Sequence, residues 1–124
     1  MSVLDFAKWV AWNAGEGKRG PDLVSAETLK KIHTPFVSTG VRDGAAPGTP
    51  KTGGYALGWG SVQESWAAAP AITHTGSNTM NLATAMFWPG KDFGFVMMTN
   101  VGGQPSDKAL KKLAAELYKG FSVK

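Results

Sequence analysis

The chain has 124 residues, an apolar fraction of 43% and a formal charge of +4 at pH 7, which fits one modest domain with its own hydrophobic core. It contains no cysteine, so disulfides, thiolate metal sites and cysteine nucleophiles are excluded. No apolar run approaches the roughly 20 residues of a membrane helix, and the N-terminus does not resemble a signal peptide. We therefore expect a single domain over residues 1–124 without a membrane segment.

Residues 1–36 have helical patterns. Apolar side chains recur at helical spacing after Ser2, which predicts a first helix that ends in the glycine-rich stretch 15–20. Ser25 is a suitable N-cap for a second short helix that ends before Pro35. In the first helix the helical spacing is set by Val3, Phe6, Val10 and Asn13, with Trp9 beside them. In the second helix, Leu29 and Ile32 are expected to face inward.

The middle of the chain changes period. Residues 37–54 are rich in glycine and proline and predict a long loop, and residues 55–100 predict a sheet. Leu82–Trp88 is apolar or small in both alternating sets, which indicates a strand covered on both faces in the middle of the sheet. The tight connection Pro89–Asp92 favours an antiparallel hairpin after it. The four expected strands are Tyr55–Val62, Ala71–Thr75, Leu82–Trp88 and Phe93–Thr99.

A helical period returns over residues 106–121, where Ser106 and Asp107 provide the start signal. Each large apolar side chain of this helix would contribute about 1.5–3 kcal/mol on burial, so the helix should dock on the sheet. We expect an α+β fold: an antiparallel sheet of three or four strands, packed with a C-terminal helix and N-terminal helices. The stripe expected to face the sheet is Leu110, Leu113, Ala114, Leu117, Tyr118 and Phe121.

Two weak motifs favour structural interpretations. The glycines of 15–20 spell G-x-G-x-x-G, but they follow a helix and run into Pro21, so they read as a flexible helix exit and not as a nucleotide loop. His33 and His74, the two histidines of the sequence, lie far apart and have no carboxylate at helical spacing, so no metal site is expected. We expect His33 to cap or pack at the end of its helix.

The candidate functional residues are His74-Thr75-Gly76-Ser77, at the end of an apolar strand. Their pattern is similar to the third motif of penicillin-recognising enzymes, in which a cationic residue, threonine and glycine line the active site. Lys51-Thr52-Gly53 is a more literal match, but it falls in the expected loop. Because a backbone N–H can stabilise a developing oxyanion only from a rigid position, we interpret the Lys51 match as a coincidence.

The chain resembles the C-terminal part of the class C β-lactamase and D-alanyl-D-alanine carboxypeptidase family, with its esterase-like relatives. The matching segments are, in order, "SVLDFAKW", "LVSAETLKKIHTP", "GYALGWG" and "HTGSNTMNLATAMFWPGKDFGFVMMTN", followed by an amphipathic helix. They cover nearly the whole chain, and His74 to Asn100 is the specific part. The resemblance implies an α/β domain with an antiparallel sheet, served by a nucleophile from a preceding, mainly helical region.

The resemblance also implies roles for the four candidate residues. Thr75 would hydrogen-bond the carboxylate or carbonyl of the substrate, and Gly76 would let the ligand approach the backbone. The backbone N–H of Ser77 would be an oxyanion-hole donor, a kind of contact whose loss typically costs about 2.7–4 kcal/mol in the transition state. Many relatives have lysine in place of His74. A histidine is mostly neutral at pH 7, which favours an esterase or peptidase-like parent over an efficient β-lactamase.

The nucleophile of that family is missing from the chain. Its serine and lysine lie in S-x-x-K, and no serine here has lysine three residues later. Neither Tyr55 nor Tyr118 has asparagine two residues on, and S-x-N does not occur. We therefore expect the C-terminal segment of a serine hydrolase that acts on amide, lactam or ester bonds through an acyl-enzyme, inactive alone. The alternative is a non-catalytic peptide- or protein-binding module derived from that fold.

The expected partners follow from this interpretation. They are the missing N-terminal part of the same enzyme and a small-molecule or peptide acyl substrate, with no metal or organic cofactor. Nucleic acid is not expected, because the lysines are scattered and no known binding motif occurs. The resemblance points to the periplasm or cell envelope for the parent enzyme, while the sequence itself leaves the compartment open.

Overall fold

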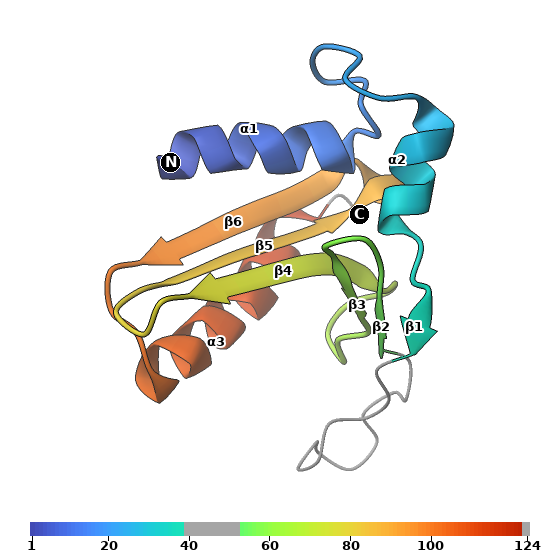
Figure 1. Ribbon diagram of the computed structural model, residues 1–124. Coiled ribbons are helices and arrows are strands. Elements are labelled where there is room, and N and C mark those ends of the chain that lie inside the picture. Colours follow the sequence, from blue (N-terminus) through green and yellow to red (C-terminus); the bar gives the residue numbers. More distant parts are fainter. Residues whose placement is uncertain (39–52, 123–124) are drawn as a thin grey trace.

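The structure is a computed structural model that describes residues 1–38 and 53–122. Within these residues it is an α+β arrangement of three α-helices, one short 3₁₀ helix and a six-stranded antiparallel sheet (Figure 1). The helices are α1 (Val3–Ala14), α2 (Ala26–His33), η1 (Pro89–Lys91) and α3 (Gln104–Phe121). The strands are β1 (Val37–Ser38), β2 (Gly53–Tyr55), β3 (Gly60–Val62), β4 (Ala71–Ser77), β5 (Leu82–Trp88) and β6 (Phe93–Thr99).

The order of the strands in the sheet follows the chain, β1 to β6, and each neighbouring pair is antiparallel. The α+β class is confirmed, but the expectation of three or four strands is wrong. The single strand expected over Tyr55–Val62 is split, because Gly58 has a φ of +83° and turns the chain back between β2 and β3. The loop expected over 37–54 is wrong at both ends, which contribute strands, and residues 39–52 lie outside the described residues.

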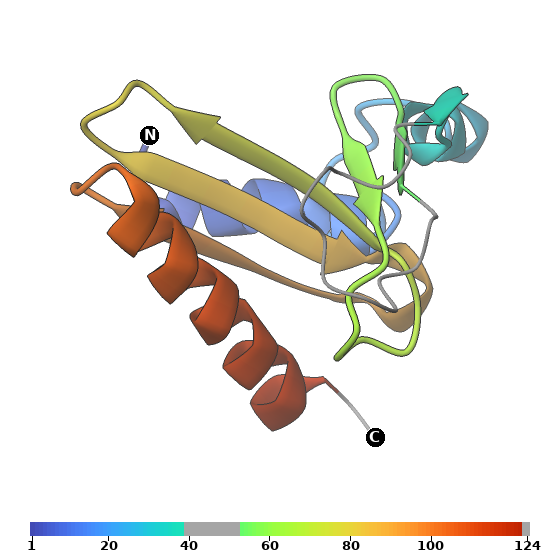
Figure 2. The same ribbon diagram turned by 90° about the horizontal axis from the view of Figure 1, so that it is seen from below.

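Helices α1 and α3 lie on opposite faces of the sheet (Figures 1 and 2). On the α1 side, Phe87 packs in one core cluster with Val10 and Ala14. On the α3 side, Trp88 packs with Tyr118 in a second cluster. Strand β5 lies between β4 and β6 and sends alternate side chains into both clusters, so the expectation of a strand covered on both faces is confirmed.

The helix start predicted after Ser2 and the N-cap predicted at Ser25 are confirmed, and Ser2 is also an N-cap. The Ser2 hydroxyl accepts the backbone N–H of Asp5 at 3.2 Å, and the Ser25 hydroxyl accepts that of Thr28 at 3.1 Å, so each satisfies a donor that the helix itself leaves unpaired. The helical spacing of the α1 sequence does not by itself mark its buried face, because Val3 and Trp9 are exposed. The buried residues of α1 are Val10, Trp12, Asn13 and Ala14, all in its second half.

The C-terminal helix begins two residues before the predicted start. Gly103 is its N-cap and Pro105 lies in its first turn, where a missing N–H leaves no hydrogen bond unmade. Figure 2 shows α3 crossing the sheet obliquely, and it docks through Ala114 and Tyr118. The expected inward stripe was too wide, since Leu113 and Phe121 are exposed.

The glycine-rich exit of α1 wraps around Trp12. The indole N–H of Trp12 donates to the carbonyl of Pro21 at 3.0 Å, and a Cβ on Gly20 would lie 3.2 Å from the indole. The G-x-G-x-x-G pattern thus follows a helix, and its third glycine is accounted for by packing against a core side chain. Within residues 1–38 and 53–122, no helix has the length and apolar character needed to cross a membrane.

Candidate functional site

The candidate residues occupy the second half of β4. Strand β3 pairs with β4 only over Ala71–Thr73, whereas β5 pairs with it as far as Ser77. Figure 1 shows β4 running on past the end of β3. Among the described strands, none pairs with the second edge of His74–Ser77, and all four residues are exposed. Ala71 and Ile72, at the start of the same strand, are buried.

His74 is held by the turn between β2 and β3. Its Nδ1 lies 2.7 Å from the carbonyl oxygen of Gly58, and its ring meets the ring of Trp59 edge-on, with the centroids 6.2 Å apart. A carbonyl oxygen only accepts hydrogen bonds, so the proton of this contact is on Nδ1. The strand residue predicted from sequence is therefore oriented by a neighbouring turn and is not free to rotate without breaking a hydrogen bond.

Thr75 and Ser77 share the other face of β4, because side chains alternate along a strand. The Thr75 hydroxyl lies 3.1 Å from that of Thr84 across the β4–β5 pair. The Ser77 hydroxyl donates to the carbonyl of Asn81 at 2.6 Å and accepts the N–H of Thr79 at 3.1 Å. The Ser77 side chain thus stabilises the turn to β5. Because its hydroxyl is engaged in these two hydrogen bonds, we do not assign it a role as a nucleophile.

Gly76 has no packing reason to be glycine. A Cβ at this position would meet no atom of residues 1–38 and 53–122 within 4 Å, whereas a Cβ on Gly94 of β6 would lie 2.6 Å from the Cβ of Phe87. Glycine within a strand weakens it and often marks a close approach by a ligand or another backbone. The open space above Gly76 is therefore compatible with such an approach, and the glycine of β6 is explained by the helix and strand packed against it.

The second lysine-threonine-glycine match falls mostly outside the described residues. Lys51 and Thr52 belong to the segment that the structure does not describe, and Gly53 begins β2. The prediction that this match lies in a loop is therefore tested only at Gly53, where it is wrong.

His33 is a packed core residue, as expected. Its Nε2 lies 2.8 Å from the side-chain oxygen of Asn13, whose amide nitrogen donates to the carbonyl of Trp9 at 2.8 Å. Its ring also meets Phe87 and Trp59 edge-on, with centroids 5.1 and 6.1 Å away. Burial lowers the pKa of His33, because removing the ring from water disfavours its charged form, and the negative charge of Glu16 partly opposes this shift.

Sequence analysis missed the turn that supports His74. Gly58 and Trp59 were assigned to a continuous strand, although the glycine inside "GYALGWG" is a signal for a break. Trp59 is buried and contacts both histidine rings edge-on. It therefore connects the core residue His33 to the exposed residue His74.

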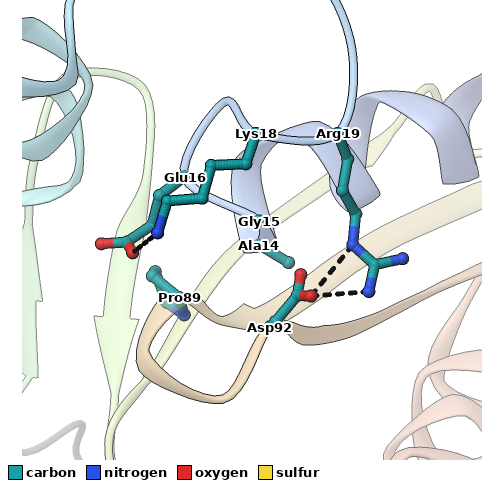
Figure 3. Close-up of a pocket in the computed structure, with 7 residues that line it drawn as sticks. All are labelled: Ala14, Gly15, Glu16, Lys18, Arg19, Pro89 and Asp92. Carbon is teal, nitrogen blue, oxygen red and sulfur yellow. Dashed lines mark hydrogen bonds and ion pairs between the residues drawn. The ribbon is translucent and has the colours of Figure 1, made fainter.

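A small hollow lies elsewhere, at the exit of α1 beside the turn between β5 and β6 (Figure 3). Its volume is about 100 Å³. The Arg19 guanidinium donates to one carboxylate oxygen of Asp92 at 2.6 and 3.0 Å, and this partner raises the pKa of Arg19. Because the ion pair is exposed and the hollow is small, we assign the ion pair a structural role: it joins the loop after α1 to the hairpin of β5 and β6.

Tyr118 has a lowered pKa on the α3 side of the sheet. The first cause is the backbone N–H of Ala68, which donates to the phenolic oxygen at 3.1 Å, and Lys91 acts in the same direction. This tyrosine belongs to the second core cluster and not to the exposed part of β4. Within residues 1–38 and 53–122, no three His, Asp or Glu side chains gather as a possible metal-ligand set.

The fold of the chain is similar to that of part of a penicillin-binding protein homologue. This solved structure is that of the octameric penicillin-binding protein homologue from Pyrococcus abyssi, which has 26% sequence identity to this chain and a TM-score of 0.68. The match covers 94% of this chain but only 24% of that chain. No protein-family model matches the sequence, and no curated protein matches it significantly.

Proposed function

We propose that the chain is the C-terminal part of a serine hydrolase of the β-lactamase and penicillin-binding-protein superfamily, and that β4 forms one wall of its acyl-transfer site. The observation that carries the proposal is the open edge of His74–Ser77, which is exposed although the first half of the same strand is anchored in the core. The similarity to a penicillin-binding protein homologue supports it. The share of that protein matched, 24%, leaves room for the nucleophile on other polypeptide.

The proposed roles rest on the position of each residue on β4. Thr75 presents a hydroxyl on one face and would hydrogen-bond a substrate carboxylate or carbonyl. Gly76 leaves open space for the ligand to approach the backbone. Ser77 contributes its backbone N–H as an oxyanion donor, since its hydroxyl is engaged by Thr79 and Asn81.

The proposed reaction is acyl transfer to a serine that this chain does not contain. The oxygen of that serine attacks the carbonyl of an amide, lactam or ester, and its proton passes by way of the lysine of S-x-x-K to the leaving group. The leaving group departs as the acyl-enzyme forms, and water then releases the acid. The part of this chain is positional and electrostatic: it orients the carbonyl and stabilises the oxyanion.

His74 decides between substrate classes within this proposal. A lysine at this position would carry a fixed positive charge for the carboxylate of a β-lactam. A neutral imidazole lacks that charge, so the proposal favours an ester or peptide-like acyl donor.

The first test measures the chain alone. It should turn over neither a chromogenic cephalosporin nor a nitrophenyl ester above the buffer rate, because no nucleophile with an activating lysine occurs in the sequence. Saturable turnover that a single substitution in this chain abolishes would overturn the assignment of an external nucleophile.

The second test supplies the nucleophile. The chain is produced together with the coding sequence that precedes it, or with a separately encoded partner that carries S-x-x-K, and acylation is followed with a fluorescent β-lactam or ester. Ser77→Pro removes the backbone N–H and should slow acylation by about 10²–10³-fold. Ser77→Ala is the matched control, because it keeps that N–H. Equal rates for the two folded variants would exclude the oxyanion role.

A non-catalytic binding module is the second candidate, and the absence of S-x-x-K from the sequence favours it over an independent enzyme. In that case a peptide would bind along the open edge of β4 by strand addition. Coding sequence upstream that contains S-x-x-K and Y-x-N supports the enzyme. A partner peptide that protects the amides of Thr75 and Ser77 from hydrogen exchange, without any acylation, supports the module.

A further inference from the structure

The two histidines of the chain are held by opposite ring nitrogens. His74 uses Nδ1 to donate to the carbonyl of Gly58 at 2.7 Å. In the neutral ring this leaves the lone pair on Nε2, where it can only accept a hydrogen bond. His33 is arranged the other way round: the amide nitrogen of Asn13 donates to Trp9, so the amide oxygen faces Nε2 of His33 and that nitrogen carries the proton.

The turn that holds His74 is itself anchored on the core. The N–H of Ala56 donates to the carbonyl of Trp59 at 2.7 Å, and the N–H of Leu57 donates to the carbonyl of Ile32, at the end of α2, at 3.3 Å. Trp59 is 7% exposed and packs in the core cluster on the α1 side of the sheet. The Gly58 carbonyl is therefore fixed by α2 and the core, and its hydrogen bond restrains an exposed ring.

We propose that the Gly58 turn holds His74 as a hydrogen-bond acceptor at the open edge of β4, which selects ligand groups with a donor, such as a hydroxyl, an amide N–H or an ammonium, and disfavours a carboxylate. The identity of the ligand as a substrate rests on the proposed function. The tautomer of the ring does not, because in the neutral ring it follows from the contact with Gly58. His74 is in this view a specificity-determining residue, and Gly58 is a positioning residue.

The physical reason for the selection is the direction of the hydrogen bond. A lone pair on Nε2 has nothing to donate to a carboxylate oxygen, and two acceptors facing one another repel. A lysine in the same place would offer three donors and a positive charge. The same strand edge would therefore bind opposite groups depending on this single residue and on the turn behind it.

The first experiment reads the ring nitrogens of the ¹⁵N-labelled chain by long-range ¹H–¹⁵N NMR at pH 8, above the ordinary titration range of histidine. The sequence contains only two histidines, so each can be assigned by substitution. For His74 the lone-pair resonance, which lies well downfield of an N–H nitrogen, should belong to Nε2. For His33 it should belong to Nδ1. A lone pair on Nδ1 of His74, or averaged resonances for its two nitrogens, would overturn the proposal.

The turn is tested by two substitutions of Gly58, which has a φ of +83° and, among the described residues, no atom within 4 Å of a Cβ placed on it. Gly58→Asn should preserve the His74 pattern, because asparagine tolerates this backbone conformation. Gly58→Val should shift both His74 resonances towards their average, because a β-branched residue does not tolerate it. The His33 resonances report whether each variant is folded. A Gly58→Val variant with His33 and His74 both unchanged would remove the turn from the explanation.

The selection is tested with sodium acetate as the carboxylate probe. In His74→Lys, acetate should shift the backbone amides of Thr75 and Gly76, and in the unmodified chain the same concentration should shift them less. Equal shifts in the two proteins, or larger shifts in the unmodified chain, would overturn the selection. Because none of these measurements needs a nucleophile, their failure is separate from failure of acylation in the assembled enzyme.

Discussion

The two halves of β4 differ although they belong to one continuous strand. Ala71 and Ile72 are paired on both sides and are 0% and 8% exposed. His74 to Ser77 have one strand neighbour among the described residues and are exposed. The first half is fixed by its contacts with the core. The second half is held by its continuous pairing with β5, while its side chains are exposed and one backbone edge has no strand neighbour among the described residues.

This arrangement shows how a strand can be rigid and still expose residues for ligand binding. A loop of four residues would have to be ordered on binding, which costs conformational entropy. Here the cross-strand pairs to β5 continue through Ser77, so His74–Ser77 are ordered before any ligand arrives. Sites on strands hold their geometry better than sites on loops. The comparison predicts that substitutions in the first half change stability, whereas substitutions in the second half change binding.

The largest difference is expected between Ile72→Ala and His74→Ala. Ile72 belongs to the core cluster on the α1 side, so its truncation should lower the free energy of unfolding by about 2–5 kcal/mol. His74 is exposed, and its replacement should cost about 1 kcal/mol or less, for the lost hydrogen bond to Gly58. Urea denaturation followed by tryptophan fluorescence measures both. Comparable losses at the two positions would show that the halves of β4 are energetically alike.

Two glycines give the next largest contrast. Gly94→Ala places a Cβ 2.6 Å from that of Phe87 and 2.9 Å from a methyl group of Val10, so it should destabilise by about 1–3 kcal/mol. Gly76→Ala places a Cβ that meets no atom of the part of the chain that the structure describes within 4 Å, and it should stabilise the fold by up to about 1 kcal/mol, because glycine is unfavourable in a strand interior. The same denaturation experiment compares them. A destabilised Gly76→Ala chain would mean that the space above β4 is filled.

Much of this fold could be predicted from local sequence patterns. Ser2 and Ser25 predicted the helix starts because capping needs only a side chain and a nearby N–H. The double apolar pattern of β5 predicted a strand covered on both faces. The strand number failed because β1 and β2 are short and glycine-rich, and their pairing depends on partners distant in sequence. A conformation that tertiary contacts impose leaves a weak local signal.

The candidate site also has parts that the sequence predicts and parts that it does not. The four residues His74–Ser77 could be proposed from sequence, because their types and order form a motif at the end of an apolar strand, and their role stays a prediction. The support from Gly58 was not found, since it is a backbone carbonyl and every residue type has one. Nor could spacing reveal that Trp59 lies between the two histidines, which are 41 positions apart (74 − 33) in the sequence.

The buried histidine predicts a pH effect that belongs to the core. Its pKa is lower in the folded chain than the ordinary value of 6.5, so the unfolded chain binds more protons in this range. The stabilising contribution of neutral His33 is complete above about pH 6.5 and decreases as the pH falls from there towards the folded pKa. Urea denaturation between pH 8 and pH 5 should therefore give a falling free energy of unfolding.

His33→Gln should flatten that decline, because glutamine can still donate to Asn13 but does not titrate. His74→Gln keeps His33 and should therefore keep the decline. If the two variants lose the same part of the pH dependence, the effect does not originate in the buried ring.

The smallest expected change in stability compares two threonines on one face of β4. Thr75→Val removes a hydroxyl that contacts Thr84 in an exposed position, and valine keeps the β-branched shape, so stability should stay within about 0.5 kcal/mol. Thr73→Val removes a hydrogen bond to the carbonyl of Ala85 in the anchored half and should cost about 1 kcal/mol. Acylation of the assembled enzyme should respond in the opposite order.

Thr75→Val should slow acylation by up to about tenfold, since a hydrogen bond to an uncharged carbonyl contributes about 0.5–1.5 kcal/mol, while Thr73→Val should leave the rate nearly unchanged. Stability and rate are thus expected to separate at two residues of the same type that lie two positions apart. Urea denaturation and fluorescent-substrate labelling of the two variants decide it. If the rate follows stability at both positions, the open half of β4 acts only as part of the scaffold, and ligand contact must come from another surface.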